Sequence, residues 1–168
     1  MLLVRADSSA WARGQAWGLY GFTVMYRETK DKKYLDQANH IADFILNNPN
    51  LPADKIPYWD FDAPNIPNAL RDASAAAIIA SALLELSGYN KAKSQNYIKV
   101  ASTIIKNLSS PEYKAAVGTN GGFVLKHSVG SLRGHSEVDV PLTYSDYYFF
   151  EAMKRYEKLA SDKKLNLK

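Results

Sequence analysis

The feature that most constrains the fold is an alternation of two kinds of helical segment, each pair followed by a long loop. Three segments, over about Trp11–Thr29, Ala73–Leu86 and Thr143–Leu159, are apolar or aromatic on nearly every side. Two others, over about Lys33–Leu46 and Ser94–Leu108, place their apolar side chains on one face. A segment that is apolar all round is buried, whereas an amphipathic one covers a core from outside. The sequence therefore predicts an all-α array of about three helical hairpins, each with an inner and an outer helix.

Two long loops separate the hairpins. The first follows the helix-stopping run Asn47–Pro52 and centres on Pro57–Pro64, and the second carries most of its glycines and serines between Gly118 and Gly134. Short extended pieces are expected at Phe123–Leu125 and Val138–Val140. We expect the loops to lie together at one end of the array, where sites usually lie.

Composition limits the classes of protein that fit. The chain has 168 residues, 46% of them hydrophobic, which predicts one domain over 1–160 and a frayed tail over 161–168. A net charge of +4 with a pI near 9.1 favours an acidic ligand only weakly, and no basic stripe predicts nucleic-acid binding. No apolar run approaches the ~20 residues of a membrane span. The lack of cysteine excludes disulfides and thiolate zinc sites.

The run Ser9–Gly18 concentrates the side chains best suited to bind a ligand. It holds Trp11, Arg13, Gln15 and Trp17 at the start of the first helix. An indole face stacks on the C–H face of a sugar, and a guanidinium binds a carboxylate or sulfate through two parallel hydrogen bonds. The run therefore predicts a surface for an anionic sugar.

Structural roles for the same residues remain open. Trp11 and Trp17 are also the residues expected in the core of a buried helix. Arg13 is alternatively a structural ion-pair partner of Asp7 or Asp72. Gln15 is expected to bond to backbone at the inner wall rather than to a ligand.

Two aspartates in the first loop raise the hypothesis of a catalytic pair. Glycosidases often use two carboxylates, and in a strand-like loop Asp60 and Asp62 would point the same way. The favoured interpretation is that they cap turns, as aspartates in proline-rich loops do. Arg71 and Asp72 are expected to form a salt bridge, with Asp72 or Ser74 capping the helix that follows.

The second loop does not predict a metal site. His135, Glu137 and Asp139 alternate along a strand-like stretch, but they lack a recognised ligand spacing and His127 is remote from them. The aromatic run Tyr147–Phe150 is expected to pack in the core.

Five segments together resemble the unsaturated glucuronyl hydrolases, glycoside hydrolase family 88: Ser9–Gly18, Pro57–Pro64, Arg71–Ile78, Gly121–Ser131 and Ser136–Ala152. The resemblance extends over nearly the whole chain. It implies an (α/α)6 barrel, a ring of six helical hairpins, of which this chain matches the C-terminal half. It implies no cofactor.

The resemblance also implies an unusual reaction. In this family an aspartate protonates the C4=C5 double bond of an unsaturated uronic acid, water adds at C5, and the resulting hemiketal breaks down to release the neighbouring sugar. Both aspartates credited with this work lie in the family's N-terminal half. No position in this chain matches them, so no catalytic residue is assigned here.

What the resemblance assigns to this chain is substrate binding. The run Ser128–Arg133 is similar to the family's Ser-x-x-Ser-x-Lys loop, which contacts sulfate on the sugar next to the uronate, with arginine in place of lysine. The implied substrate is a sulfated glycosaminoglycan fragment produced by a polysaccharide lyase. The implied substrate-binding residues are Trp11, Arg13, Trp17, Ser128, Ser131 and Arg133.

Alternative functions follow because the family's two catalytic aspartates match no position in this chain. The chain is alternatively a non-catalytic module that binds anionic sugars, or half of a split or dimeric enzyme. Half a ring exposes the apolar flanks of its inner helices, which predicts a homodimer or association with an N-terminal half. The resemblance places such proteins in the periplasm or cytoplasm of bacteria and does not distinguish the two.

Overall fold

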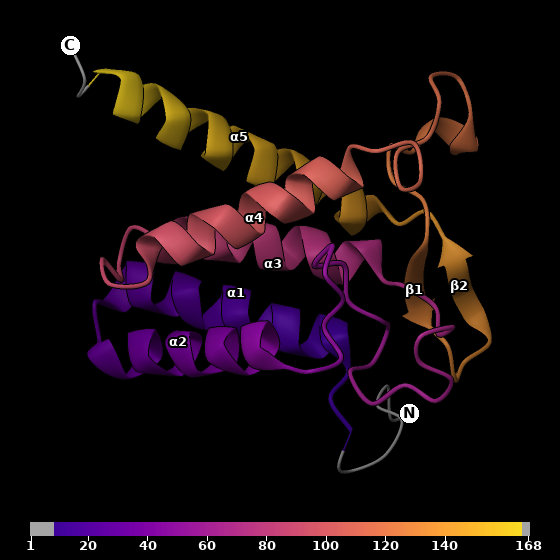
Figure 1. The fold of residues 1–168 in the computed structure, drawn as a ribbon, viewed down its shortest axis with the longest axis horizontal. Helices are drawn as coiled ribbons and strands as arrows, with labels where there is room; N and C mark the ends of the chain where they lie inside the picture. Colours follow the sequence, from indigo (N-terminus) through magenta and orange to yellow (C-terminus); the bar gives the residue numbers. More distant parts are fainter. Residues whose placement is uncertain (1–8, 166–168) are drawn as a thin grey trace.

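The computed structural model of the chain describes residues 9–165. Five α-helices form its body: α1 (Ala12–Thr29), α2 (Lys32–Asn47), α3 (Ala73–Leu86), α4 (Ser94–Leu108) and α5 (Thr143–Leu165). The second loop holds a short 3₁₀ turn, η1 (Asn120–Gly122), and two strands, β1 (Ser128–Ser131) and β2 (Ser136–Val140). The long loop after α2 and the β1–β2 hairpin gather at one end of the helices (Figure 1).

The helix α3 forms the centre of the molecule. Its sequence is almost entirely alanine, isoleucine and leucine, and every residue except Glu85 is buried. It packs between α1 and α5, while α2 covers α1 and α4 covers α3. The side chain of Asp72 caps it by accepting hydrogen bonds from the backbone N–H groups of Ser74 (3.0 Å) and Ala75 (3.4 Å). The cap predicted at Asp72 is therefore confirmed. The predicted salt bridge between Arg71 and Asp72 is wrong, because Arg71 pairs with Asp54 and Asp72 pairs with Arg13.

The two outer helices follow their amphipathic patterns. In α2, Ala38, Ala42 and Ile45 are buried, and Asp31 caps the helix by accepting from the N–H of Lys33. In α4 the buried stripe runs over Tyr97, Val100, Ala101, Ile104 and Leu108.

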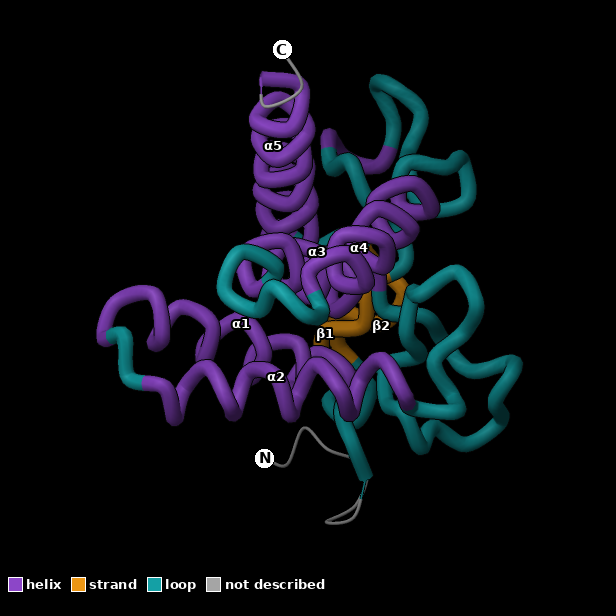
Figure 2. Tube along the Cα trace, turned by 60° about the vertical axis from the view of Figure 1, so that its left-hand side comes forward, coloured by secondary structure: helices purple, strands orange, loops and turns teal. Residues whose placement is uncertain are grey.

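The expectation that all three inner helices are buried on most sides is wrong for two of them. On α1, Met25 is exposed, and on α5 Tyr147 and Phe150 are exposed. Within residues 9–165 only α3 has an inner helix on each side, which leaves one flank of α1 and one of α5 uncovered. Helix α5 also projects away from the α1–α2 pair (Figure 2). The aromatic run therefore divides: Phe149 packs in the core, whereas Tyr147 and Phe150 do not.

Two boundaries also differ from the prediction. Helix α5 continues to Leu165 rather than ending near Leu159, so it takes in the start of the predicted tail; residues 166–168 lie outside the described residues. The extended piece expected at Phe123–Leu125 supplies only an isolated bridge from Leu125 to Lys114. The strand lies at Ser128–Ser131 and pairs antiparallel with β2, with a bulge between Ser128 and Val129.

In the described part of the chain, no helix is both long and apolar enough to cross a lipid bilayer.

Candidate anionic-sugar site

The first loop holds the beginning of α1 in place. The N–H of Ala12 donates to the carbonyl of Trp59 (3.1 Å), and the N–H of Phe61 donates to the carbonyl of Ala10 (2.9 Å). These bonds pin the backbone on both sides of Trp11. The indole of Trp11 folds back over Gly14, where a Cβ atom would lie 2.7 Å from the ring carbon Cε3. Glycine at this position therefore allows the ring to lie on the helix.

Arg13 connects three parts of the site. Its guanidinium lies over the ring of Trp11, 4.7 Å from the ring centroid, and 5.5 Å from that of Tyr144. It donates hydrogen bonds to the backbone carbonyls of Val129 and Gly130 in β1. Only 4% of Arg13 is exposed, so its buried side chain connects the start of α1 to the hairpin.

The ion pair between Arg13 and Asp72, weighed as the structural alternative, is present. Arg13 Nη1 lies 3.4 Å from Asp72 Oδ2, and the carboxylate is fully buried. Burial raises the pKa of the Asp72 carboxyl, and the nearby positive charge of Arg13 opposes that rise. Asp7, the other partner considered for Arg13, lies outside the described residues. Arg13 therefore has a structural role whatever it does for a ligand.

Trp17 belongs to an aromatic wall formed with α5. Its ring centroid lies 5.1 Å from that of Tyr148, edge to face, and 6.2 Å from that of Tyr144. Tyr20 continues the wall against Tyr148 at 5.0 Å. Trp11, Trp17 and Tyr144 are each half-buried, so part of every ring remains accessible.

The three hairpin residues predicted to bind sulfate occupy different environments. Ser128 is fully buried and donates a hydrogen bond from its hydroxyl to that of Ser145 (3.3 Å). Ser131 is half-buried and accepts from the N–H of Gly134 (3.2 Å). Arg133 is exposed at the turn and makes no ion pair with the residues that the structure describes. The structure therefore brings Ser131 and Arg133 to the surface but not Ser128.

An acidic side chain covers the inner strand of the hairpin. A Cβ atom on Gly130 would lie 2.2 Å from Glu137 Oε2 and 2.5 Å from Glu137 Cβ. Glycine at 130 thus leaves room for the side chain of Glu137, which comes from β2. Glu137 is also one of the charges that raise the pKa of Tyr144, although burial of the phenol is the main cause.

The interpretation of Asp60 and Asp62 as turn-forming residues is supported. The N–H of Asp62 donates to Asp60 Oδ1 (2.8 Å), and Asp62 Oδ2 accepts from the N–H of Ala10 (3.2 Å). Asp60 is fully buried whereas Asp62 is exposed, so the two carboxylates do not face a common space. Between residues 9 and 162, no cluster of three or more His, Asp or Glu side chains is arranged to hold a metal.

Sequence reasoning missed the contribution of α5 to this site. Tyr144 and Tyr148 lie one helical turn apart, and between them they contact Trp17 and Arg13, whereas the sequence predicts only that the run Tyr147–Phe150 packs in the core. Their i, i+4 spacing was the available signal, because such residues share one face of a helix.

Known proteins similar to the chain agree on one family. No family model matches it. The unsaturated glucuronyl hydrolase of Formosa agariphila is 47% identical over 90% of this chain and 38% of its own length. That of Bacillus sp. strain GL1 is 35% identical over 90% of this chain and 40% of its own. The chain thus spans about 40% of the length of these relatives.

Solved structures give the same result for the fold. A crystal structure of an unsaturated glucuronyl hydrolase specific for heparin superposes with a TM-score of 0.89 at 59% identity, covering 92% of this chain and 41% of that one. The predicted fold class, all-α and part of an (α/α)6 barrel, is confirmed, with a small two-stranded sheet added. Over about 90% of its length the chain is similar in sequence and fold to the unsaturated glucuronyl hydrolases, glycoside hydrolase family 88, and it matches about 40% of their length.

Proposed function

We propose that this chain supplies the substrate-binding surface of an unsaturated glucuronyl hydrolase. The proposed substrate carries an unsaturated uronic acid at the non-reducing end of a glycosaminoglycan oligosaccharide left by a lyase. The proposed reaction hydrates the C4=C5 double bond, and the hemiketal then releases the neighbouring sugar. The observation that carries the proposal is the position of Arg13, which joins the aromatic wall to the serine- and arginine-bearing hairpin.

The names of the relatives support this substrate class. Similar chains from streptococci are named unsaturated chondroitin disaccharide hydrolases. A solved structure of the Streptococcus agalactiae enzyme, 32% identical with a TM-score of 0.83 over 90% of this chain and 40% of that one, is complexed with dGlcA-GalNAc6S. That ligand combines an unsaturated uronate with a sulfated neighbour.

The roles proposed for individual residues follow from the ring faces and hydrogen-bond donors that the fold leaves unused. Trp11 and Trp17 stack on the sugar rings through their accessible faces. Arg13 has five N–H donors, of which three are used on Val129, Gly130 and Asp72. The remaining two suit the uronate carboxylate. Because Arg13 is buried, its main proposed role is to position the hairpin.

The hairpin is proposed to bind the sulfate. Arg133 is exposed, carries a full charge and offers a fork of N–H groups that matches a sulfate. The hydroxyl of Ser131 faces the same turn, since it accepts from Gly134. Ser128 supports this surface from beneath through its bond to Ser145.

A chimera tests the proposed activity. The part of the Formosa agariphila enzyme that matches this chain is replaced by the chain itself, and loss of the ultraviolet absorbance of the conjugated double bond is followed. The expected result is turnover of unsaturated chondroitin disaccharides, lost when Trp17→Ala is added. A folded chimera that binds the disaccharide but does not consume it would support the non-catalytic alternative instead.

A further inference from the structure

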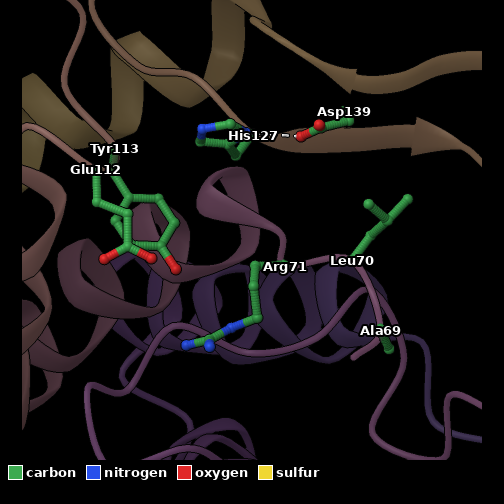
Figure 3. Close-up of a pocket in the computed structure, with 7 residues that line it drawn as sticks. All are labelled: Ala69, Leu70, Arg71, Glu112, Tyr113, His127 and Asp139. Carbon is green, nitrogen blue, oxygen red and sulfur yellow. Dashed lines mark hydrogen bonds and ion pairs between the residues drawn. The ribbon is translucent and has the colours of Figure 1, made fainter. Parts of the chain in front are cut away.

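A cavity lies at the base of the β1–β2 hairpin, and none of the residues predicted to bind the anionic sugar lines it. Its volume is about 220 Å3, which is below the ~300–1,000 Å3 usual for drug-sized ligands. Side chains from the first loop, from the segment after α4 and from the hairpin surround it (Figure 3). The lining residues are Ala69, Leu70, Arg71, Glu112, Tyr113, His127 and Asp139.

Neighbouring residues in the sequence have different surroundings. Arg71 and His127 line the cavity, whereas the residues that follow them are fully buried, Asp72 against Arg13 and Ser128 against Ser145. The N–H of Ala73 donates to the carbonyl of His127 (3.1 Å), which fastens the two segments together. The cavity is therefore separate from the candidate anionic-sugar site and shares its supporting backbone.

The cavity contains a buried hydroxyl with no partner. Tyr113 is 2% exposed, and its hydroxyl makes no hydrogen bond within the described chain. Burial raises the pKa of Tyr113 to about 12, so the hydroxyl keeps its proton and remains a donor near neutral pH. In Figure 3 the ring directs this hydroxyl toward the side of the cavity where Arg71 lies. Buried hydroxyls without partners are rare, because an unmade hydrogen bond is costly.

The charges around the cavity disfavour an anion. Arg71 already donates to the carbonyl of Ile56 (2.9 Å) and to the carboxylate of Asp54. His127 Nδ1 lies 2.8 Å from Asp139 Oδ1. Arg71 and the ring Nδ1 of His127 thus each already face a carboxylate, while Glu112 is exposed and has no ion-pair partner in the described chain.

An apolar ligand fits no better, because it would leave the buried hydroxyl of Tyr113 without a partner and would cover the carboxylate of Glu112, which is otherwise exposed to water. A polyhydroxylated ligand satisfies both, since each of its hydroxyls donates to one group and accepts from another.

We propose that this cavity is a second carbohydrate site, which takes one neutral pyranose ring. Tyr113 and Arg71 donate to hydroxyl oxygens of the ring. Glu112 and the free oxygen of Asp139 accept from its hydroxyl groups, and Ala69 and Leu70 contact its C–H face. The ring is a free neutral sugar or a neutral unit of a longer oligosaccharide.

The test is saturation-transfer NMR on the full chain with glucose and N-acetylgalactosamine at millimolar concentration. We expect both to bind, and Tyr113→Phe to weaken binding about three- to tenfold, the effect of one hydrogen bond. Glu112→Gln, a change at an exposed position, is expected to weaken it less. Displacement of the monosaccharide by a neutral oligosaccharide, and not by an unsaturated uronide disaccharide, would identify the longer chain as the source of the ring.

A matched control separates a ligand role from a structural one. Without sugar, Tyr113→Phe is expected to leave Tm unchanged or raise it, because it removes an unpaired buried hydroxyl. Tyr97→Phe is expected to lower Tm, because the hydroxyl of Tyr97 bonds to Asn39 Oδ1 (2.8 Å). The proposal is overturned if neither monosaccharide binds, or if Tyr113→Phe lowers Tm and leaves sugar binding unchanged. Neither result would bear on the anionic-sugar site, which Arg13 and Trp17 variants test independently.

Discussion

At the scale of single residues, Arg13 shows both what sequence can predict and where it stops. Its importance and its possible pairing with Asp72 followed from the chemistry of a guanidinium next to apolar neighbours. Its bonds to the carbonyls of Val129 and Gly130 did not, because backbone acceptors 116 and 117 residues away leave no mark on side-chain pattern. The burial of Ser128 could not be predicted for the same reason, since its hydroxyl bonds to Ser145 in another element.

The buried pair makes a quantitative prediction. Arg13→Ala leaves the fully buried carboxylate of Asp72 without its cation, so we expect a loss of about 3–5 kcal/mol in the free energy of unfolding. Adding Asp72→Asn removes the unpaired charge and keeps a residue that caps helices well, so part of the loss is expected to return. Urea denaturation of the two variants measures this. A double variant as unstable as the sum of its single changes would contradict the pairing.

Two of the three glycines of α1, Gly14 and Gly21, provide a second test at this scale. Gly14→Ala places a Cβ atom 2.7 Å from the ring of Trp11 and displaces it, so binding of the unsaturated disaccharide is expected to weaken about three- to tenfold. Gly21→Ala meets no atom within 4 Å and is expected to stabilise the protein by about 0.5–1 kcal/mol without changing affinity. Calorimetric titration compares them, and equal affinities for both variants would remove Trp11 from the site.

At the scale of elements, prediction succeeded where one physical signal was strong and local. The bounds of α3 and α4 came out residue for residue, because a dense apolar run and a clear amphipathic stripe end at polar or glycine-containing turns. The strand β1 was missed because Ser128–Ser131, with its glycine and two serines, has the composition of a turn. Its pairing with β2 decides its conformation.

The side chain of Arg133 is expected to confer sulfate preference without contributing to stability. Arg133→Ala should lower affinity for a sulfated unsaturated disaccharide about three- to tenfold and leave the unsulfated one unchanged, because the side chain is exposed and free of ion pairs in the described chain. Arg133→Lys should retain part of the affinity, since it keeps the charge but loses the fork. Equal losses for both disaccharides would show that Arg133 does not read the sulfate.

At the scale of the whole molecule, the arrangement of the hairpins followed from the sequence but the extent of burial did not. An apolar sequence predicts that a helix is buried, but it does not identify which element or partner buries it. The exposed side chains Met25, Tyr147 and Phe150 lie on the flanks of α1 and α5 for this reason. The predicted homodimer or partnership with a further half-ring stays a prediction.

Alkaline pH is expected to unfold the chain in a defined window. Burial raises the pKa values of Tyr20, Tyr97 and Tyr113 from 10.0 to about 12. Below pH 10 these phenols are protonated in both folded and unfolded chains. Between pH 10 and 12 the unfolded chain loses its protons first, so stability falls as pH rises through this range.

Tyr97→Phe should make that fall shallower, by roughly 1–3 kcal/mol across the window, because one raised pKa is removed. Urea unfolding at several pH values, with phenolate absorbance as the monitor of ionisation, measures the change. An unaltered pH dependence would show that Tyr97 ionises alike in both states.

Binding of an unsaturated, sulfated uronide disaccharide to the 168-residue chain tests the central claim most directly. Calorimetry measures the affinity while the absorbance of the double bond is followed in the same solution. We expect saturable binding that Trp17→Ala abolishes, with constant absorbance, because the family's proton-donating aspartates match no position here. Absence of binding would contradict the assignment of the site. Loss of absorbance would show that the chain supplies its own acid and would contradict the proposed division between binding and chemistry.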